Sequence, residues 1–104
     1  MDPRRITDDF FVSPQITPAE MPAIKAAGFN SILCNRPDGE EPSQPGFDDV
    51  AQAAEAEGIA VRAVPIISGR LTEADTEAFR AAFKALPKPI LAYCRSGTRC
   101  TMMW

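Results

Sequence analysis

The sequence predicts an α/β domain with a mostly parallel sheet flanked by helices. Short apolar segments alternate with helix-forming segments along the chain, an order typical of parallel strands with helices packed on both faces of a sheet. Glycines and prolines separate these segments at regular intervals, as expected for turns between elements. The 104 residues, 45% of them hydrophobic, suffice for one modest core, so we expect one domain over residues 1–104.

The first half of the chain is expected to contain strands on either side of a helix. Residues 4–12 carry apolar and β-branched side chains and predict two short strands or a hairpin. The run Thr17-Pro18-Ala19-Glu20 has the form of a capping box with proline at the first helical position, which predicts a helix over 17–27. Gly28 ends that helix, and residues 29–34 read as a buried strand.

The second half repeats the alternation of helices and strands. Three prolines between residues 37 and 45 keep the loop after the buried strand irregular. Thr72 caps a later helix whose apolar side chains recur at helical spacing. The expected elements are a helix over 47–57, a strand over 59–64, a helix from Thr72 to about residue 86, and a strand over 90–93.

Composition excludes several kinds of function. The chain has no histidine, so it cannot supply a Ser-His-Asp triad, a Cys-His pair or a histidine-ligated zinc site; we expect no metal and no cofactor. A net charge of -3 without a basic stripe argues against nucleic acid as a partner. No apolar run reaches the length of a membrane span, and the first residues do not resemble a signal peptide, so we expect a cytoplasmic protein that does not bind membranes.

The segment from Cys94 to Arg99 carries the strongest indication of chemistry. It follows an apolar strand, contains Gly97, and leads into a predicted helix start. Backbone N–H groups in such a turn converge on an anion, and the helix N-terminus adds a partial positive charge. Arg99 offers a planar fork for two oxygens, and Arg95 adds a second positive charge. We therefore expect the pKa of the Cys94 thiol to be lowered, which makes Cys94 a nucleophile that needs no histidine.

We predict Cys94 and Arg99 as catalytic residues, and Arg95, Ser96, Gly97 and Thr98 as substrate-binding residues. A purely structural interpretation stays open, because an apolar strand that ends in cysteine is often only part of a core. In parallel sheets the functional groups gather at the carboxyl ends of the strands. We therefore expect Cys34, the 64–69 loop and Cys94 to lie near one another.

Two resemblances to known families follow from these residues. The segment from Tyr93 to Arg99 resembles the active-site loop of rhodanese sulfurtransferases, Cys-Arg-x-Gly-x-Arg/Thr. Nearly the whole chain resembles the phosphatase-like domain of the beta-lactamase hydrolase-like family, through Ile6-Thr7-Asp8-Asp9-Phe10, Val12-Ser13-Pro14-Gln15-Ile16-Thr17, Gly28-Phe29, Asn35-Arg36-Pro37-Asp38-Gly39-Glu40 and Val64-Pro65. The resemblance implies a dual-specificity-phosphatase-like fold. It also implies fusion or association with a persulfide dioxygenase or a sulfide oxidoreductase, and hence sulfide and persulfide metabolism.

Departures from the phosphatase pattern favour sulfur transfer. Four residues separate Cys94 from Arg99, where cysteine phosphatases have five. Residues 65–70 carry no carboxylate, and Tyr93 stands where those enzymes have histidine. Without a general acid, loss of an alkoxide is slow by about 10²–10⁴-fold, whereas a thiolate or sulfite leaves without protonation.

The leading hypothesis is therefore a sulfurtransferase that passes sulfane sulfur through a Cys94 persulfide, from a small anionic donor to a thiol acceptor. The alternatives are a protein-tyrosine or dual-specificity-type phosphatase acting through a Cys94 phosphocysteine, and a non-catalytic anion-binding module.

Residues elsewhere in the chain have secondary candidate roles. Arg36 is a candidate substrate-binding residue, with an ion pair as the equal alternative. Cys34 is a candidate resolving thiol for Cys94, although a buried structural thiol is favoured. Cys100 is a second candidate resolving thiol, for which a small residue facing the expected helix is favoured. Further candidates are a substitute acid among Asp38, Glu40 and Glu41, where a turn is favoured. Ser68, Gly69 and Arg70 are a candidate pocket rim, with a plain loop as the equal alternative.

The end of the chain bears on the rigidity of the loop from Cys94 to Arg99. Trp104 falls only about a turn and a half into the helix expected after Arg99, too short to be stable alone. Either the native chain continues past this residue, or the domain lacks its C-terminal helix.

Overall fold

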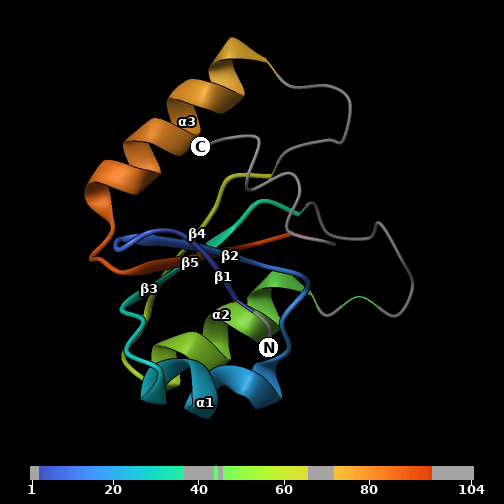
Figure 1. Cartoon of the computed structure of the whole chain (residues 1–104). Coiled ribbons are helices and arrows are strands. Elements are labelled where there is room, and N and C mark those ends of the chain that lie inside the picture. Colours follow the sequence, from blue (N-terminus) through green and yellow to red (C-terminus); the bar gives the residue numbers. More distant parts are fainter. Residues whose placement is uncertain (1–2, 37–43, 45, 66–71, 95–104) are drawn as a thin grey trace.

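A five-stranded sheet forms the centre of the molecule (Figure 1). The structure is a computed structural model that describes residues 3–36, 44, 46–65 and 72–94. The strands lie in the order β1-β2-β5-β3-β4; β1 and β2 are antiparallel, and the other neighbours are parallel. The predicted α/β class with a mostly parallel sheet is confirmed. The strand bounds are Arg4–Thr7 for β1, Phe10–Ser13 for β2, Ser31–Cys34 for β3, Ala60–Ala63 for β4 and Ile90–Tyr93 for β5.

Helices cover the two faces of the sheet (Figure 1). Helices α1 (Met21–Ala26) and α2 (Phe47–Ala56) lie against one face, and α3 (Glu73–Ala85) lies against the other. The helix expected over 17–27 begins instead as a 3₁₀ turn, Pro18–Glu20, because the first turn after a cap often tightens to i→i+3 hydrogen bonds.

Capping and turn residues set the helix ends as the sequence indicates. The backbone N–H of Asp75 donates to the Thr72 hydroxyl, and the Thr72 N–H donates to the Asp75 carboxylate, each at 3.1 Å. Both are bonds of the capping box. Gly58 follows α2 with φ of 75°, a left-handed conformation in which glycine carries no steric penalty.

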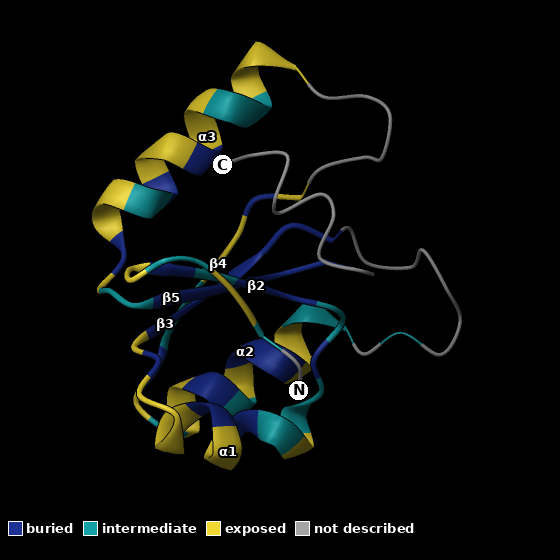
Figure 2. Ribbon diagram, viewed as in Figure 1, coloured by how far each residue is buried: buried dark blue, intermediate teal, exposed yellow. Residues whose placement is uncertain are grey.

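The sheet separates two apolar clusters, and both are buried (Figure 2). The cluster on the α3 face includes Phe10 of β2 and Phe79 of α3, whose rings meet edge to face with centroids 5.6 Å apart, a favourable geometry for aromatic pairs. The cluster on the α1/α2 face is built from β3, β5 and both helices. Strand β5 is buried along its whole length, since it lies between β2 and β3 with helices above and below. Among the described residues, none of the helices is long and apolar enough to cross a membrane.

Candidate functional site

The carboxyl ends of four strands meet at one edge of the sheet, and Cys94 lies in the middle of that edge. Cys94 directly follows the central strand β5, and its backbone N–H donates to the carbonyl of Ser13 at the end of β2, 3.3 Å away. On the other side, the N–H of Asn35 donates to the carbonyl of Tyr93 at 2.9 Å. The N–H of Val64 donates to the carbonyl of Cys34 at 2.8 Å. The ends of β3, β4 and β5 therefore lie side by side, as expected; residues 66–69 of the 64–69 loop lie outside the described residues.

Cys94 is fully buried at this edge. It packs in the cluster on the α3 face, where the described side chains around it include Leu33, Val64 and Ala92. Burial in apolar surroundings by itself favours the neutral thiol. A thiolate at this position therefore requires positive charge or N–H donors from the residues that follow Cys94 or from neighbouring strand ends.

Asn35 is a polar residue at this edge that sequence reasoning did not single out. Its side chain is fully buried, and its amide Nδ2 donates to the Val64 carbonyl at 3.0 Å. Cys34 pairs with Tyr93 in the register of β3 and β5. Asn35, the residue after Cys34, is therefore level with Cys94, the residue after Tyr93. The sequence signal that could have identified Asn35 is its position directly after a fully buried strand, where a polar side chain can hydrogen-bond to the backbone of neighbouring strand ends.

Arg36 is also buried, with 4% of its surface exposed. Its guanidinium Nη1 donates to Oε1 of Gln15 at 2.9 Å, and Nε2 of Gln15 donates to the Ile16 carbonyl at 2.8 Å. The second bond fixes the orientation of the Gln15 amide and leaves its oxygen facing the arginine. Arg36 therefore lies inside the edge and not on the surface; its substrate-binding role and the alternative of a structural ion pair both stay predictions.

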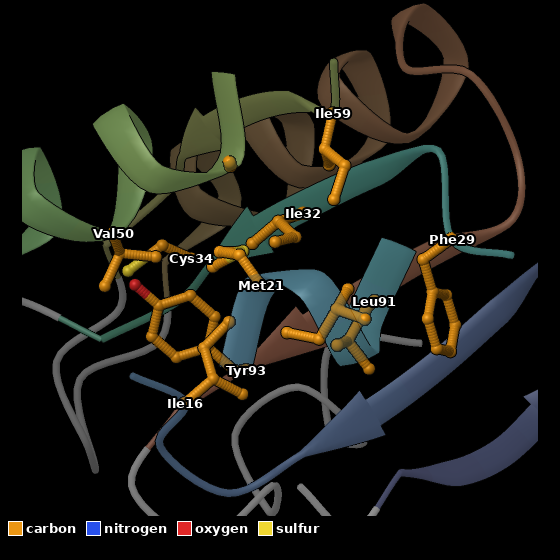
Figure 3. Close-up of a cluster of buried hydrophobic side chains, with 11 residues drawn as sticks. Ile16, Met21, Phe29, Ile32, Cys34, Val50, Ile59, Leu91 and Tyr93 are labelled. Atoms are coloured by element: carbon orange, nitrogen blue, oxygen red, sulfur yellow. The ribbon is translucent and has the colours of Figure 1, made fainter. Parts of the chain in front are cut away.

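Cys34 lies across the sheet from Cys94. Its thiol belongs to the cluster on the α1/α2 face, together with Tyr93, whereas Cys94 belongs to the cluster on the α3 face. Figure 3 shows the Tyr93 ring reaching toward Cys34 and Val50. The Cys34 Sγ lies 3.3 Å from the carbonyl oxygen of Arg36, as a hydrogen-bond donor. The two cysteines belong to clusters on opposite faces of the sheet, an arrangement that agrees with the favoured alternative of a buried structural thiol. The resolving role of Cys34 stays a prediction.

The family of the chain is decided by comparison with known proteins. The family model for the beta-lactamase hydrolase-like protein, phosphatase-like domain, matches residues 2–104. The chain belongs to this family. The beta-lactamase hydrolase-like protein of Xylella fastidiosa is 39% identical to this phosphatase-like domain over 99 residues, which cover 95% of the chain and 23% of that protein. The domain thus spans about a quarter of the length of this curated relative.

Solved structures support the same fold for the phosphatase-like domain. A candidate phosphatase from Neisseria meningitidis has 38% sequence identity and a TM-score of 0.89, over 96% of this chain and 71% of that one. TpbA from P. aeruginosa, solved in complex with phosphotyrosine, has 14% identity and a TM-score of 0.65, over 97% of this chain and 58% of that one. The predicted dual-specificity-phosphatase-like fold is confirmed. The phosphatase alternative fits better than the sulfurtransferase hypothesis, because the matching family model is that of a phosphatase-like domain and the 38% identical structure is that of a candidate phosphatase.

Several predicted site residues of the phosphatase-like domain lie outside the described residues. In the part of the chain that is described, no group of three or more His, Cys, Asp or Glu side chains could hold a metal ion. The roles predicted for the following residues stay predictions: Arg95, Ser96, Gly97, Thr98 and Arg99 in the loop; Asp38, Glu40 and Glu41 as a substitute acid; Ser68, Gly69 and Arg70 as a rim; and Cys100.

Proposed function

We propose that this domain is a cysteine-dependent phosphatase that hydrolyses phosphate monoesters through Cys94. The observation that carries the proposal is the place of Cys94 at the carboxyl end of the central strand β5, within a fold similar to that of TpbA in complex with phosphotyrosine. The sequence after Cys94 supports it, since Arg-Ser-Gly-Thr-Arg supplies backbone N–H groups and guanidinium groups suited to a dianion.

The reaction proceeds in two displacements at phosphorus. The Cys94 thiolate attacks the phosphorus atom, an S–P bond forms, the ester P–O bond breaks, and the leaving oxygen departs with the bonding electron pair. Water then attacks the phosphocysteine, the S–P bond breaks, and the thiolate returns. Both protons of that water remain on the released dihydrogen phosphate, so charge and atoms balance. Arg99 holds two oxygens of the transferred group throughout.

The leaving group defines the substrate class. Residues 65–70 contain no carboxylate, so this stretch offers no general acid to protonate a departing alkoxide. A phenolate leaves without that help, and a general acid is worth about 10²–10⁴-fold for poorer leaving groups. We therefore propose aryl phosphates, of which phosphotyrosine is the biological example, over alkyl phosphates.

The test compares two cysteine variants on p-nitrophenyl phosphate and on an alkyl phosphate. Cys94→Ser should lower aryl phosphate turnover by about a thousandfold or more, because it removes the nucleophile. Cys34→Ser is the matched control: it changes a buried cysteine at the end of the adjacent strand, on the opposite face of the sheet, and should retain activity. The wild-type domain should prefer the aryl substrate.

Thiosulfate with a thiol acceptor provides the competing assay. The proposal is overturned if Cys94→Ser leaves aryl phosphate turnover unchanged. It is equally overturned if the wild-type domain has no phosphatase activity but transfers sulfur from thiosulfate in a Cys94-dependent manner.

A further inference from the structure

Asn35 carries a buried hydrogen-bond acceptor that has no partner, next to the proposed nucleophile. Its side chain is fully buried, and its amide Nδ2 donates to the Val64 carbonyl. Among the residues that the structure describes, the other terminal atom of this amide, Oδ1, is buried and has no hydrogen-bond partner. An unpaired buried acceptor lowers stability, and a catalytic role is one reason for which a protein keeps such a group.

The backbone places Asn35 beside Cys94 on the same face of the sheet. Cys34 is level with Tyr93 in the register of β3 and β5, and the N–H of Asn35 still donates to the Tyr93 carbonyl. The strand geometry therefore holds through Asn35, which is level with Cys94. Side chains alternate between the two faces along a strand. Asn35 thus shares the face of Leu33, which packs in the same cluster as Cys94.

The hydrogen bond to Val64 determines the direction of Oδ1. Strand β3 lies between β4 and β5, and Val64 directly follows β4, so Nδ2 lies on the β4 side of Asn35. The two terminal atoms of a planar amide lie on opposite sides of Cγ, and Oδ1 is therefore directed away from β4, the side on which Cys94 lies. Neighbouring strands are about 4.8 Å apart, which brings Oδ1 within reach of a molecule held at the Cys94 sulfur.

The chemistry of Oδ1 limits what it can hold beside Cys94. An amide oxygen only accepts hydrogen bonds, and the deprotonated oxygens of a phosphoryl group are acceptors as well, so the two do not bind each other. Water is a donor, and it is the second substrate of the proposed reaction. Residues 65–70 contain no carboxylate that could hold this water.

We propose that Oδ1 of Asn35 orients the water that hydrolyses the Cys94 phosphocysteine. This inference rests on the proposed function, in which Cys94 is the nucleophile. One O–H of the water donates to Oδ1, which turns a lone pair of the water oxygen toward phosphorus. The new O–P bond forms as the S–P bond breaks, and the electron pair of the S–P bond returns to sulfur. Both protons stay on the released dihydrogen phosphate, because the amide only accepts a hydrogen bond and takes no proton.

The test separates the two displacements by rapid mixing with p-nitrophenyl phosphate. The first displacement releases nitrophenolate and sets kcat/KM, whereas hydrolysis of the phosphocysteine limits kcat when it is the slower step. Asn35→Ala removes the acceptor, and Asn35→Ser leaves a shorter polar group in its place. Ser31→Ala is the matched control, since Ser31 is fully buried at the other end of β3 and its hydroxyl donates to the Pro87 carbonyl at 2.6 Å.

We expect both Asn35 variants to lower kcat and KM together by about tenfold and to keep kcat/KM within about twofold of the wild-type value. Each variant should release a burst of nitrophenolate, close to one per Cys94, before the steady state, because the phosphocysteine accumulates. Ser31→Ala should keep the wild-type kcat and KM, although it also loses a buried hydrogen bond.

A purely structural Asn35 predicts a different result. A smaller folded fraction lowers kcat and kcat/KM by the same factor, leaves KM unchanged and produces no burst; this result overturns the proposal. Where Asn35→Ala unfolds, Asn35→Ser decides. A wild-type domain without aryl phosphatase turnover overturns the proposed function and this inference with it. Cys94-dependent turnover in the wild type, without the joint fall of kcat and KM in the Asn35 variants, overturns only the role of Asn35.

Discussion

The side-chain amide of Asn35 donates a hydrogen bond to the carbonyl of Val64 at 3.0 Å, and so joins the ends of β3 and β4 beside Cys94. The backbone N–H of the same residue bonds to Tyr93 at the end of β5. Asn35 therefore connects the ends of three strands. Because Cys94 follows one of these strands directly, the position of Cys94 depends on the hydrogen bonds of Asn35.

Replacing Asn35 by alanine should lower the free energy of unfolding by about 1–3 kcal/mol, because the Val64 carbonyl loses its side-chain donor within buried surroundings. Asn30→Ala is the matched control, since its Nδ2 donates to the Lys88 carbonyl at 2.7 Å in an exposed position. There water replaces the lost donor, and the expected loss is below about 1 kcal/mol. Urea unfolding measures both; equal losses would contradict the scaffold role of Asn35.

Substitution of Gly58 should be destabilising because of the backbone conformation at this position, and not because a side chain would lack room. Its φ is 75°, and a Cβ added there would meet nothing within 4 Å. Gly58→Ala should therefore cost about 1 kcal/mol of unfolding free energy, the penalty for an L-residue in the left-handed region. Gly58→Asn should cost less, since asparagine tolerates this conformation. A thermal unfolding series in which the asparagine variant is the less stable would disprove this explanation.

The capping box of α3 gives a third prediction. Thr72→Ala removes the hydroxyl that accepts from the Asp75 N–H and should reduce the unfolding free energy by about 1 kcal/mol. Thr76 lies one turn further into α3, where its hydroxyl donates to the Thr72 carbonyl at 3.3 Å. Thr76→Ala should change stability by less than about 0.5 kcal/mol. The denaturant midpoints of the two variants measure this difference. A larger loss of stability in Thr76→Ala than in Thr72→Ala would contradict the capping role of Thr72.

Oxidation should not join Cys34 to Cys94. The two thiols belong to clusters on opposite faces of the sheet, and a disulfide needs Cβ atoms within about 4.5 Å. After treatment of the folded domain with hydrogen peroxide, non-reducing peptide mapping should reveal no Cys34–Cys94 linked peptide. Such a peptide in high yield under folded conditions would show that the described packing of Cys94 is wrong.

The sequence predicted the helices and strands well where prolines, glycines or capping residues mark their ends. The strand over 90–93 agrees with β5, because Pro87 and Pro89 end the preceding helix and leave a short apolar run. The cap at Thr72 was equally clear, since threonine precedes acidic residues at the start of an amphipathic segment. The strand expected over 59–64 is shorter in the structure, Ala60–Ala63, as strand ends depend on what the neighbouring strand can pair with.

The geometry of the site was less accessible from the sequence. Strands β3 and β5 are buried on both faces, so their sequences lack the alternation that tells which side chains share a face. The register of Cys34 with Tyr93 places the two cysteines on opposite faces, and only the assembled sheet reveals it. The contact of Arg36 with Gln15 joins residues 21 positions apart, without any local pattern that links them.

The most direct test of the central claim is to trap the covalent intermediate. The wild-type domain is mixed with an aryl phosphate, quenched rapidly, and digested for mass spectrometry of the peptide that carries Cys94. The account predicts an added mass of about 80 Da on Cys94, one phosphoryl group on the nucleophile. Absence of this adduct, together with a gain of about 32 Da on Cys94 after incubation with thiosulfate, would contradict it in favour of a persulfide.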